Sequence, residues 1–230
     1  MNFDDLILEN VVFEVRYKHG FLYWDNFGKL WKGLASKWPD LVCMKVDPEN
    51  AHIRLKEQFI DVTFGPEKSF ISQHTPKDIG DFCEIVDESI DLIHSYLEIN
   101  TFLRVGNRFI FVMPFDTEEE AVQAMNRTSL FSLNPDKTKH LGKTLKDIGI
   151  RLMHHDDDMG CTLNIKSVNR ELPTIDLPFP GKLDTPWFHK IGMIVDVDHF
   201  TTKTVDFGIL KSSELIKTNL HRVRLLMKSL

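Results

Sequence analysis

The chain has 230 residues, 42% hydrophobic and 27% charged, a composition typical of a globular protein that buries a substantial core. Its formal charge of −6 argues against nucleic acid or an anionic membrane as the main partner, because such binding needs clustered Lys and Arg. The charge is uneven: residues 1–100 hold 10 Lys and Arg against 18 Asp and Glu, a balance of −8, so residues 101–230 carry +2.

The N-terminus and the cysteines both favour a cytoplasmic protein. Residues 1–5 are acidic and lack the basic and apolar regions of a secretory signal. No apolar run approaches the roughly 18 residues of a membrane-spanning helix. Cys43, Cys83 and Cys161 show no C-x-x-C spacing, so we expect thiols packed in the core rather than disulfides or zinc ligands.

The first predicted strand covers residues 11–17, where apolar and polar side chains alternate with the period of a half-buried strand. A helix is predicted over residues 24–38, capped by Asp25 or Asn26 and ended by Pro39. Side chains at spacings of three and four predict its buried stripe, which consists of Trp24, Phe27, Trp31, Leu34 and Trp38.

Four strands and a long helix are predicted next. The strands cover residues 41–46, 52–56, 59–64 and 70–73, with Pro- and Gly-containing turns between them. Thr75 as cap and Pro76 in the first turn predict a helix that runs to about residue 99. Its predicted buried stripe consists of Ile79, Phe82, Val86, Ile90, Ile93 and Leu97.

The second half begins with a long strand over residues 102–113, followed by a short helix that Thr117 and three glutamates start. Residues 127–143 are polar and irregular, and residues 148–168 predict a hairpin with an Asp-rich turn. A proline-rich connection over residues 171–187 leads to a strand at 191–200. The last helix is capped by Ser212 or Ser213 and buries Ile216, Leu220, Val223, Met227 and Leu230.

This order predicts an α+β protein made of two related halves, residues 1–100 and 101–230, within one compact unit. Each half has the order β-α-β(n)-α, with a curved antiparallel sheet packed on a long helix. Helix-grip and TATA-box-binding-protein-like folds share this order, and the comparison concerns topology alone.

Three segments carry a family resemblance. The first strand contains Phe13-Glu14-Val15-Arg16-Tyr17, the mid-chain strand contains Arg104-Val105-Gly106-Asn107-Arg108-Phe109, and Val195-Asp196-Val197-Asp198 precedes the last helix. The chain thereby resembles a sporadically distributed bacterial family of uncharacterised proteins with the patterns F-E-[ILV]-R-[FY], R-[IV]-G-x-R-[FY] and D-[IV]-D plus a terminal helix. Asn107 departs from the pattern, which more often has an apolar residue there. The resemblance implies a fold and no biochemical activity.

The same three strands place charges on one face of otherwise apolar segments. The candidate ligand-binding residues are Glu14, Arg16, Arg104, Arg108, Asp196 and Asp198. Because buried charges are costly without partners, we predict that the first strands of the two halves are neighbours and that these groups form one network. The favoured interpretation is a set of cross-strand ion pairs that fix register; the alternative is a polar floor whose arginine forks bind an anionic or peptide ligand.

No segment predicts catalysis or a cofactor. His154-His155-Asp156-Asp157-Asp158 could supply metal ligands, but its place at a hairpin tip favours a turn, so we expect no metal and no cofactor. The common nucleophile, P-loop, zinc-helix and dinucleotide motifs are absent.

The sequence therefore favours a non-enzymatic binding or protein-interaction module. One alternative is a ligand-binding protein or enzyme that uses a cavity between the sheet and a long helix. Another is nucleic-acid binding by the more basic second half, although nucleic acid is the less favoured partner. A membrane partner is not expected, a homodimer is compatible with the sequence, and the ligand or protein partner is not identified by it.

Overall fold

A computed structural model describes residues 6–127, 145, 148–170, 174–176, 182–184 and 189–229. The first half contains β1 (Ile7–Arg16), α1 (Leu22–Lys37), β2 (Leu41–Val46), β3 (Ala51–Leu55), β4 (Ile60–Phe64), β5 (Lys68–His74) and α2 (Gly80–Leu97). The second contains β6 (Thr101–Phe102), β7 (Arg104–Pro114), α3 (Glu118–Asn126), β8 (Gly149–His155), β9 (Met159–Asn169), β10 (Thr174–Asp176), β11 (Lys182–Asp184), β12 (Ile191–Thr201), β13 (Val205–Asp206), η2 (Phe207–Ile209) and α5 (Ser212–Ser229).

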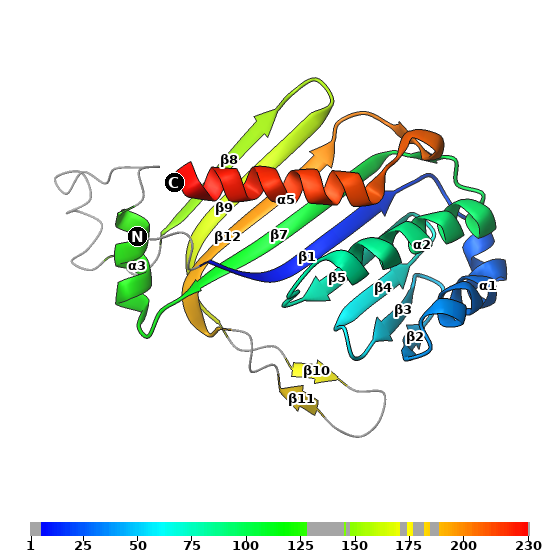
Figure 1. The fold of residues 1–230 in the computed structure, drawn as a ribbon, viewed down its shortest axis with the longest axis horizontal. Helices are drawn as coiled ribbons and strands as arrows, with labels where there is room; N and C mark the ends of the chain where they lie inside the picture. Colours follow the sequence, from blue (N-terminus) through cyan, green and yellow to red (C-terminus); the bar gives the residue numbers. More distant parts are fainter. Residues whose placement is uncertain are drawn as a thin grey trace.

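Nine strands of the two halves form one antiparallel sheet, which confirms the α+β class. Its order is β2-β3-β4-β5-β1-β7-β12-β9-β8, so the first strands of the two halves pair at the centre. The long helices α2 and α5 lie side by side across one face of the sheet, each over its own half (Figure 1). We call the opposite face the polar face.

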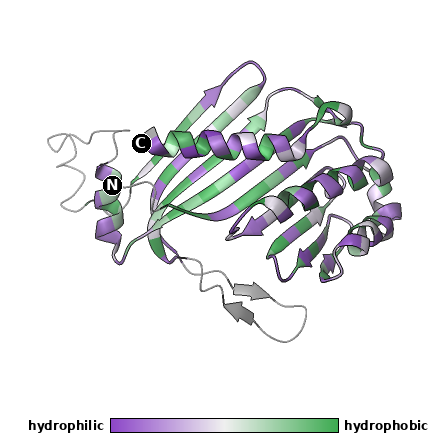
Figure 2. Ribbon diagram, in the orientation of Figure 1, coloured by the Kyte–Doolittle hydropathy of each residue, from purple (hydrophilic) through white to green (hydrophobic). Residues whose placement is uncertain are grey.

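The alternation of side chains along each strand decides which face a residue joins. Val11, Phe13 and Val15 of β1 point toward the helices and are completely buried. Figure 2 shows the same alternation of apolar and polar residues along the central strands. Since the apolar set fills the space under the helices, the intervening charged residues are left on the polar face.

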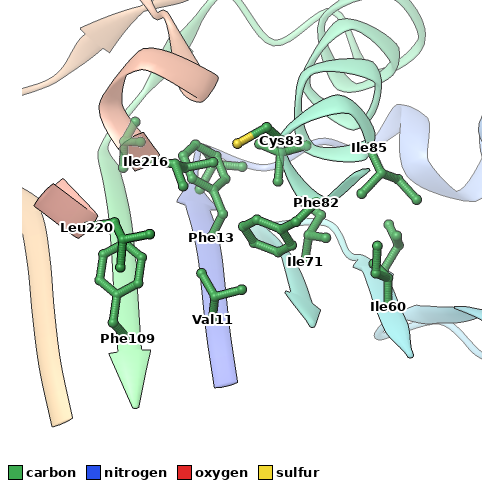
Figure 3. Packing of buried hydrophobic residues seen from close by; sticks show 14 of the residues in the cluster. Val11, Phe13, Ile60, Ile71, Phe82, Cys83, Ile85, Phe109, Ile216 and Leu220 are labelled. Atoms are coloured by element: carbon green, nitrogen blue, oxygen red, sulfur yellow. The ribbon is translucent and has the colours of Figure 1, made fainter. Parts of the chain in front are cut away.

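The core joins the helices to the centre of the sheet. Figure 3 shows Phe82 of α2 against Phe13 and Ile71, and Leu220 of α5 over Phe109. All of these side chains are buried, as are the other predicted positions of the α5 stripe that the structure describes, Ile216, Val223 and Met227. A core shared by both long helices makes the two halves one packed unit.

Two predicted helix starts are wrong. Helix α2 begins at Gly80 rather than at Thr75, because the backbone N–H of Thr75 still donates to Glu9 of β1 (2.8 Å) and Thr75 has a φ of 44°. Helix α1 begins at Leu22, so Asp25 and Asn26 lie inside it and do not cap it; the side-chain amide of Asn26 instead donates to the carbonyl of Tyr96 near the end of α2 (2.9 Å). The Thr117 start of α3 is confirmed, with reciprocal bonds between Thr117 and Glu120.

The predicted stripe of α1 is wrong at its first position. Tyr23 is buried, whereas Trp24 is 54% exposed. The indole N–H of Trp24 donates to the carbonyl of Pro48 (2.9 Å), which holds the ring outside the core. The expectation of core cysteines is confirmed for Cys83 and wrong for Cys43, which is exposed on β2.

The predictions for residues 128–143 and for Leu230 lie outside the described residues. Within the proline-rich connection the structure describes the backbone of β10 and β11, which pair antiparallel with each other. The predicted strand at 102–113 is divided at Leu103, whose N–H donates to the carbonyl of Arg16 (2.7 Å).

Candidate functional site

The predicted site residues come together on three adjacent strands, β1, β7 and β12, at the centre of the polar face. The guanidinium of Arg104 donates one hydrogen bond through Nη1 to Glu14 (2.8 Å) and another through Nη2 to Asp198 (2.8 Å). These bonds connect β7 to β1 and to β12, across separations of 90 and 94 residues in the chain. Arg16 donates to the same oxygen of Glu14 (2.7 Å). The predicted contact between Glu14 and an arginine of the second half is therefore confirmed.

Gly106 explains how Arg104 reaches both acids. In the sheet register Gly106 pairs with Glu14 on one side and with Phe200 on the other. A Cβ atom at this position would lie 3.2 Å from Nη1 of Arg104, so the guanidinium crosses the strand where a side chain is missing. The guanidinium then lies 4.6 Å from the ring centroid of Phe200, within the range of a cation–π contact.

Arg108 forms a separate pair instead of joining one network. Its Nε and Nη2 atoms donate to the two oxygens of Asp196 (2.8 and 2.7 Å), a bidentate fork that Asn164 supplements at 3.5 Å. In the register Glu14 lies opposite Gly106 and diagonal to both Arg104 and Arg108, but Arg104 bonds Glu14 whereas Arg108 reaches across to β12. The hydrogen bond from Arg108 to Asp196 raises the pKa of the arginine.

The electrostatics of Asp198 differ from those of an ordinary surface ion pair. Burial raises the pKa of Asp198 above its usual value, although Arg104 acts in the opposite direction. The single donor that reaches this carboxylate therefore does not offset its loss of water. Across the six residues the three acids and three arginines balance, and the bonds described leave no arginine of the site without a carboxylate partner. This arrangement supports the register-fixing interpretation over capture of an anion.

A second charged cluster on the same face was not predicted. Asp61 of β4 is only 6% exposed and accepts two bonds from Arg54 (2.6 and 2.9 Å) and one from His52 (2.8 Å), with His74 at 3.7 Å. Burial alone would raise the pKa of Asp61, but the bonds from His52, His74 and Arg54 together hold it far below its usual range. Alternation places these residues on one face, but only the pairing of β3, β4 and β5 brings them together.

A groove of about 990 Å³ lies on the polar face of the first half. Its floor consists of side chains of β3, β4 and β5, including His52, Asp61, Thr63, Phe70 and Ser72. Its rim consists of Arg16, Tyr17, Lys45, Pro48, Glu49, Asn50, Gly65, Pro66, Glu67, Lys68 and Leu103. The volume is at the upper end of the roughly 300–1,000 Å³ of small-molecule pockets.

Three exposed rings lie beside rim residues of this groove, although none of the three lines the groove itself. His19 stacks on Phe21 with ring centroids 5.3 Å apart, and Phe21 contacts Trp24 at 5.7 Å. Phe21 is 61% exposed. We refer to His19, Phe21 and Trp24 as the aromatic ridge. Two bonds attach this ridge to rim residues of the groove, one from Trp24 to the carbonyl of Pro48 and one between His19 and Glu67 (3.2 Å).

The hairpin tip at residues 154–158 shows no geometry for a metal. Asp158 forms an ion pair with Lys203 (2.5 Å), and the ring of His155 stands edge-on to Phe200. Among the described residues no three His, Cys, Asp or Glu side chains are close enough together to hold an ion.

Comparison of the chain with protein-family models and with curated proteins finds no match. In the described parts of the chain, none of the helices combines the length and apolar composition needed to cross a membrane. The geometry of the polar face is therefore the basis for a functional interpretation.

Proposed function

We propose that this protein is a non-enzymatic interaction module, and that the groove with its aromatic ridge binds an extended segment of a protein partner. The observation that carries the proposal is the aromatic ridge, because exposed aromatic side chains gathered in one place are typical of protein interfaces. An extended chain suits a groove whose floor is formed by neighbouring strands.

The charges of the groove support a polypeptide ligand. Asp61 is neutralised by Arg54 and His52, Lys45 pairs with Asp47, and Arg16 pairs with Glu14. No single sign dominates the residues that line the groove, as it would in a site for nucleic acid or phosphate. Exposed Leu103 and the ring of Phe70 add apolar contact area between the polar groups.

The test compares variants of two largely exposed apolar residues. Phe21→Ser removes the centre of the aromatic ridge, whereas Ile209→Ser changes a side chain on η2 that is 72% exposed and belongs to neither the groove nor the ridge. Affinity capture from the native host, quantified by mass spectrometry, should give proteins retained by wild type and by Ile209→Ser but lost with Phe21→Ser. Calorimetry with the purified candidate should then show binding weakened at least about tenfold by Phe21→Ser, as expected for an interface hot spot. Equal retention by all three proteins would contradict the proposal.

We further propose that the two halves arose by duplication of one unit, in a topology like that of the TATA-box-binding protein. Three features support this proposal. In each half the first strand of the nine-stranded sheet pairs with the last strand of that sheet before the long helix, as β1 with β5 and β7 with β12. A helix follows the first strand in both halves, and α2 and α5 close them. The resemblance of the chain to the uncharacterised bacterial family is a separate prediction, on which the duplication proposal does not depend.

A further inference from the structure

A second cavity lies on the other side of the sheet, between the C-terminal part of α5 and the beginning of β1. This slot has a volume of about 330 Å³ and is separate from the groove, since the two share no residue. Its apolar lining consists of Leu6, Leu8, Phe111, Leu225 and Met227. Leu8 and Phe111 are neighbours in the sheet register, so they form a continuous apolar floor under the helix.

The polar residues that line the slot are all basic. His221, Arg224 and Lys228 follow one another at spacings of three and four on α5, so they form a single stripe along the mouth. All three are exposed, and no described carboxylate lines the slot. The nearest acid of β1, Glu9, is buried and paired with Arg170. In a chain of net charge −6, such a one-signed rim attracts anions locally.

We infer that this slot binds a medium-chain carboxylate, with the alkyl chain on Leu8, Phe111 and Met227 and the carboxylate at Arg224 and Lys228. The charge of the rim is complementary to a carboxylate, and the guanidinium of Arg224 can donate two parallel bonds to it. The volume is at the lower limit of roughly 300–1,000 Å³ for ligand pockets, which favours a small amphiphile over a protein segment. Leu225, 54% exposed, lies at the mouth where the chain would enter.

The proposal predicts a dependence on chain length. Each methylene that enters the slot should strengthen binding about fourfold, because burying one contributes roughly 0.8 kcal/mol. The gain should stop when the slot is full, since further methylenes remain in water. A non-specific hydrophobic surface would show no such plateau.

Isothermal titration of the full chain with hexanoate, octanoate, decanoate and dodecanoate, each below its micelle concentration, tests the inference. We expect affinity to rise with length to a plateau and Arg224→Gln to weaken decanoate binding about tenfold, the effect of losing a charged hydrogen bond. Lys217→Gln is the matched control, because Lys217 is an exposed cation of α5 that does not line the slot. Circular dichroism of both variants verifies that they are folded.

Three results would overturn the inference. The first is no saturable heat with any of the four carboxylates. The second is equal binding of decanol and decanoate, which would remove the role of the cationic rim. The third is sedimentation showing that Leu225→Glu converts a dimer into a monomer, which would make the slot an interface between two copies. None of these outcomes depends on the groove, so the two proposals fail or stand separately.

Discussion

Two carboxylates on the polar face, Asp61 and Asp198, show opposite behaviour although both pair with arginine. Asp61 has the lowered pKa and is nearly inaccessible, whereas Asp198 has the raised pKa and a side chain that is 30% exposed. The more deeply buried acid is therefore the one whose charged form is better stabilised. Burial by itself would give the reverse order.

The number of donors explains the difference. Asp61 receives a bidentate fork from Arg54 and a further bond from His52, with His74 nearby. Asp198 receives one bond from Arg104, and that guanidinium is shared with Glu14. A carboxylate that loses water stays ionised only where several donors replace the lost hydrogen bonds. The donors around Asp61 thus stabilise its charged form despite its burial.

The largest effect is expected for Asp61→Asn. An amide cannot neutralise Arg54, whose side chain is only 12% exposed, so the variant leaves a buried charge unpaired. Removing one partner of such a pair costs roughly 3–5 kcal/mol of the free energy of unfolding, to be measured by urea denaturation at pH 7. Asp25→Asn is the control, since Asp25 is exposed on α1. A loss no greater than that of the control would remove the proposed difference between the two acids.

Acid should erase the effect of Asp61→Asn. The folded-state pKa of Asp61 is depressed, so its contribution is fully present above the unfolded pKa of about 3.9 and is lost as pH falls toward the folded value. The difference in unfolding free energy between wild type and Asp61→Asn should therefore be constant from pH 7 to 5 and shrink below about pH 4. A difference that does not change down to pH 2 would contradict this assignment.

An intermediate effect is expected for Arg104→Met. The substitution leaves Asp198 without its donor, while Glu14 retains Arg16. We expect a loss of about 1–3 kcal/mol in urea denaturation, the usual cost of an unsatisfied, partly buried polar group. Arg151→Met is the matched control, because Arg151 is exposed on the edge strand β8. Equal losses in the two variants would show that the central ion pairs do not support the sheet.

Asp198→Asn should cost less than about 1 kcal/mol, since the amide oxygen can still accept from Arg104 and burial already disfavours the carboxylate. The pH dependence has the opposite sign to that of Asp61. Because the folded-state pKa of Asp198 is raised, the folded protein binds this proton more readily, and wild type gains stability over Asp198→Asn as pH falls through that raised value. Thermal unfolding between pH 7 and 4 measures this trend, and a relative loss of wild type on acidification would refute it.

The smallest effect is expected for Arg16→Ala. The side chain of Arg16 is 53% exposed, and Glu14 keeps its bond to Arg104 in the variant. Exposed ion pairs of this kind typically contribute less than about 1 kcal/mol, so the unfolding midpoint in urea should change little. A change as large as that of Arg104→Met would show that Glu14 depends on both arginines.

Much of the fold was predictable because local patterns are strong in this chain. The strand at 41–46 agrees with β2 at both ends, and the strands after it agree within two residues. The helix starts at Thr75 and Asp25 were wrong, and at Thr75 a long-range contact outweighed a local capping preference. At Thr75 that contact is the bond to Glu9, 66 positions earlier in the chain.

The site was predicted in part for the same reason. The six charged residues were found because they interrupt apolar strands, and their approach to one another is confirmed for Glu14, Arg104 and Asp198. The separate pair of Arg108 and Asp196 could not be predicted, because Glu14 lies diagonal to both Arg104 and Arg108 and the strand pattern does not choose between them. The Asp61 cluster was missed although its residues are close in sequence, since no motif marks it.

The sequence by itself determined which side chains share a face, because the period of two along a strand is a property of the backbone. It also determined the order of most elements, through apolar spacing and turn residues. Only the tertiary structure decided which residues became partners, since the register between β1, β7 and β12 joins strands that are far apart in the chain. The groove, the aromatic ridge and the slot beside α5 have the same origin, as each joins segments that no local pattern connects.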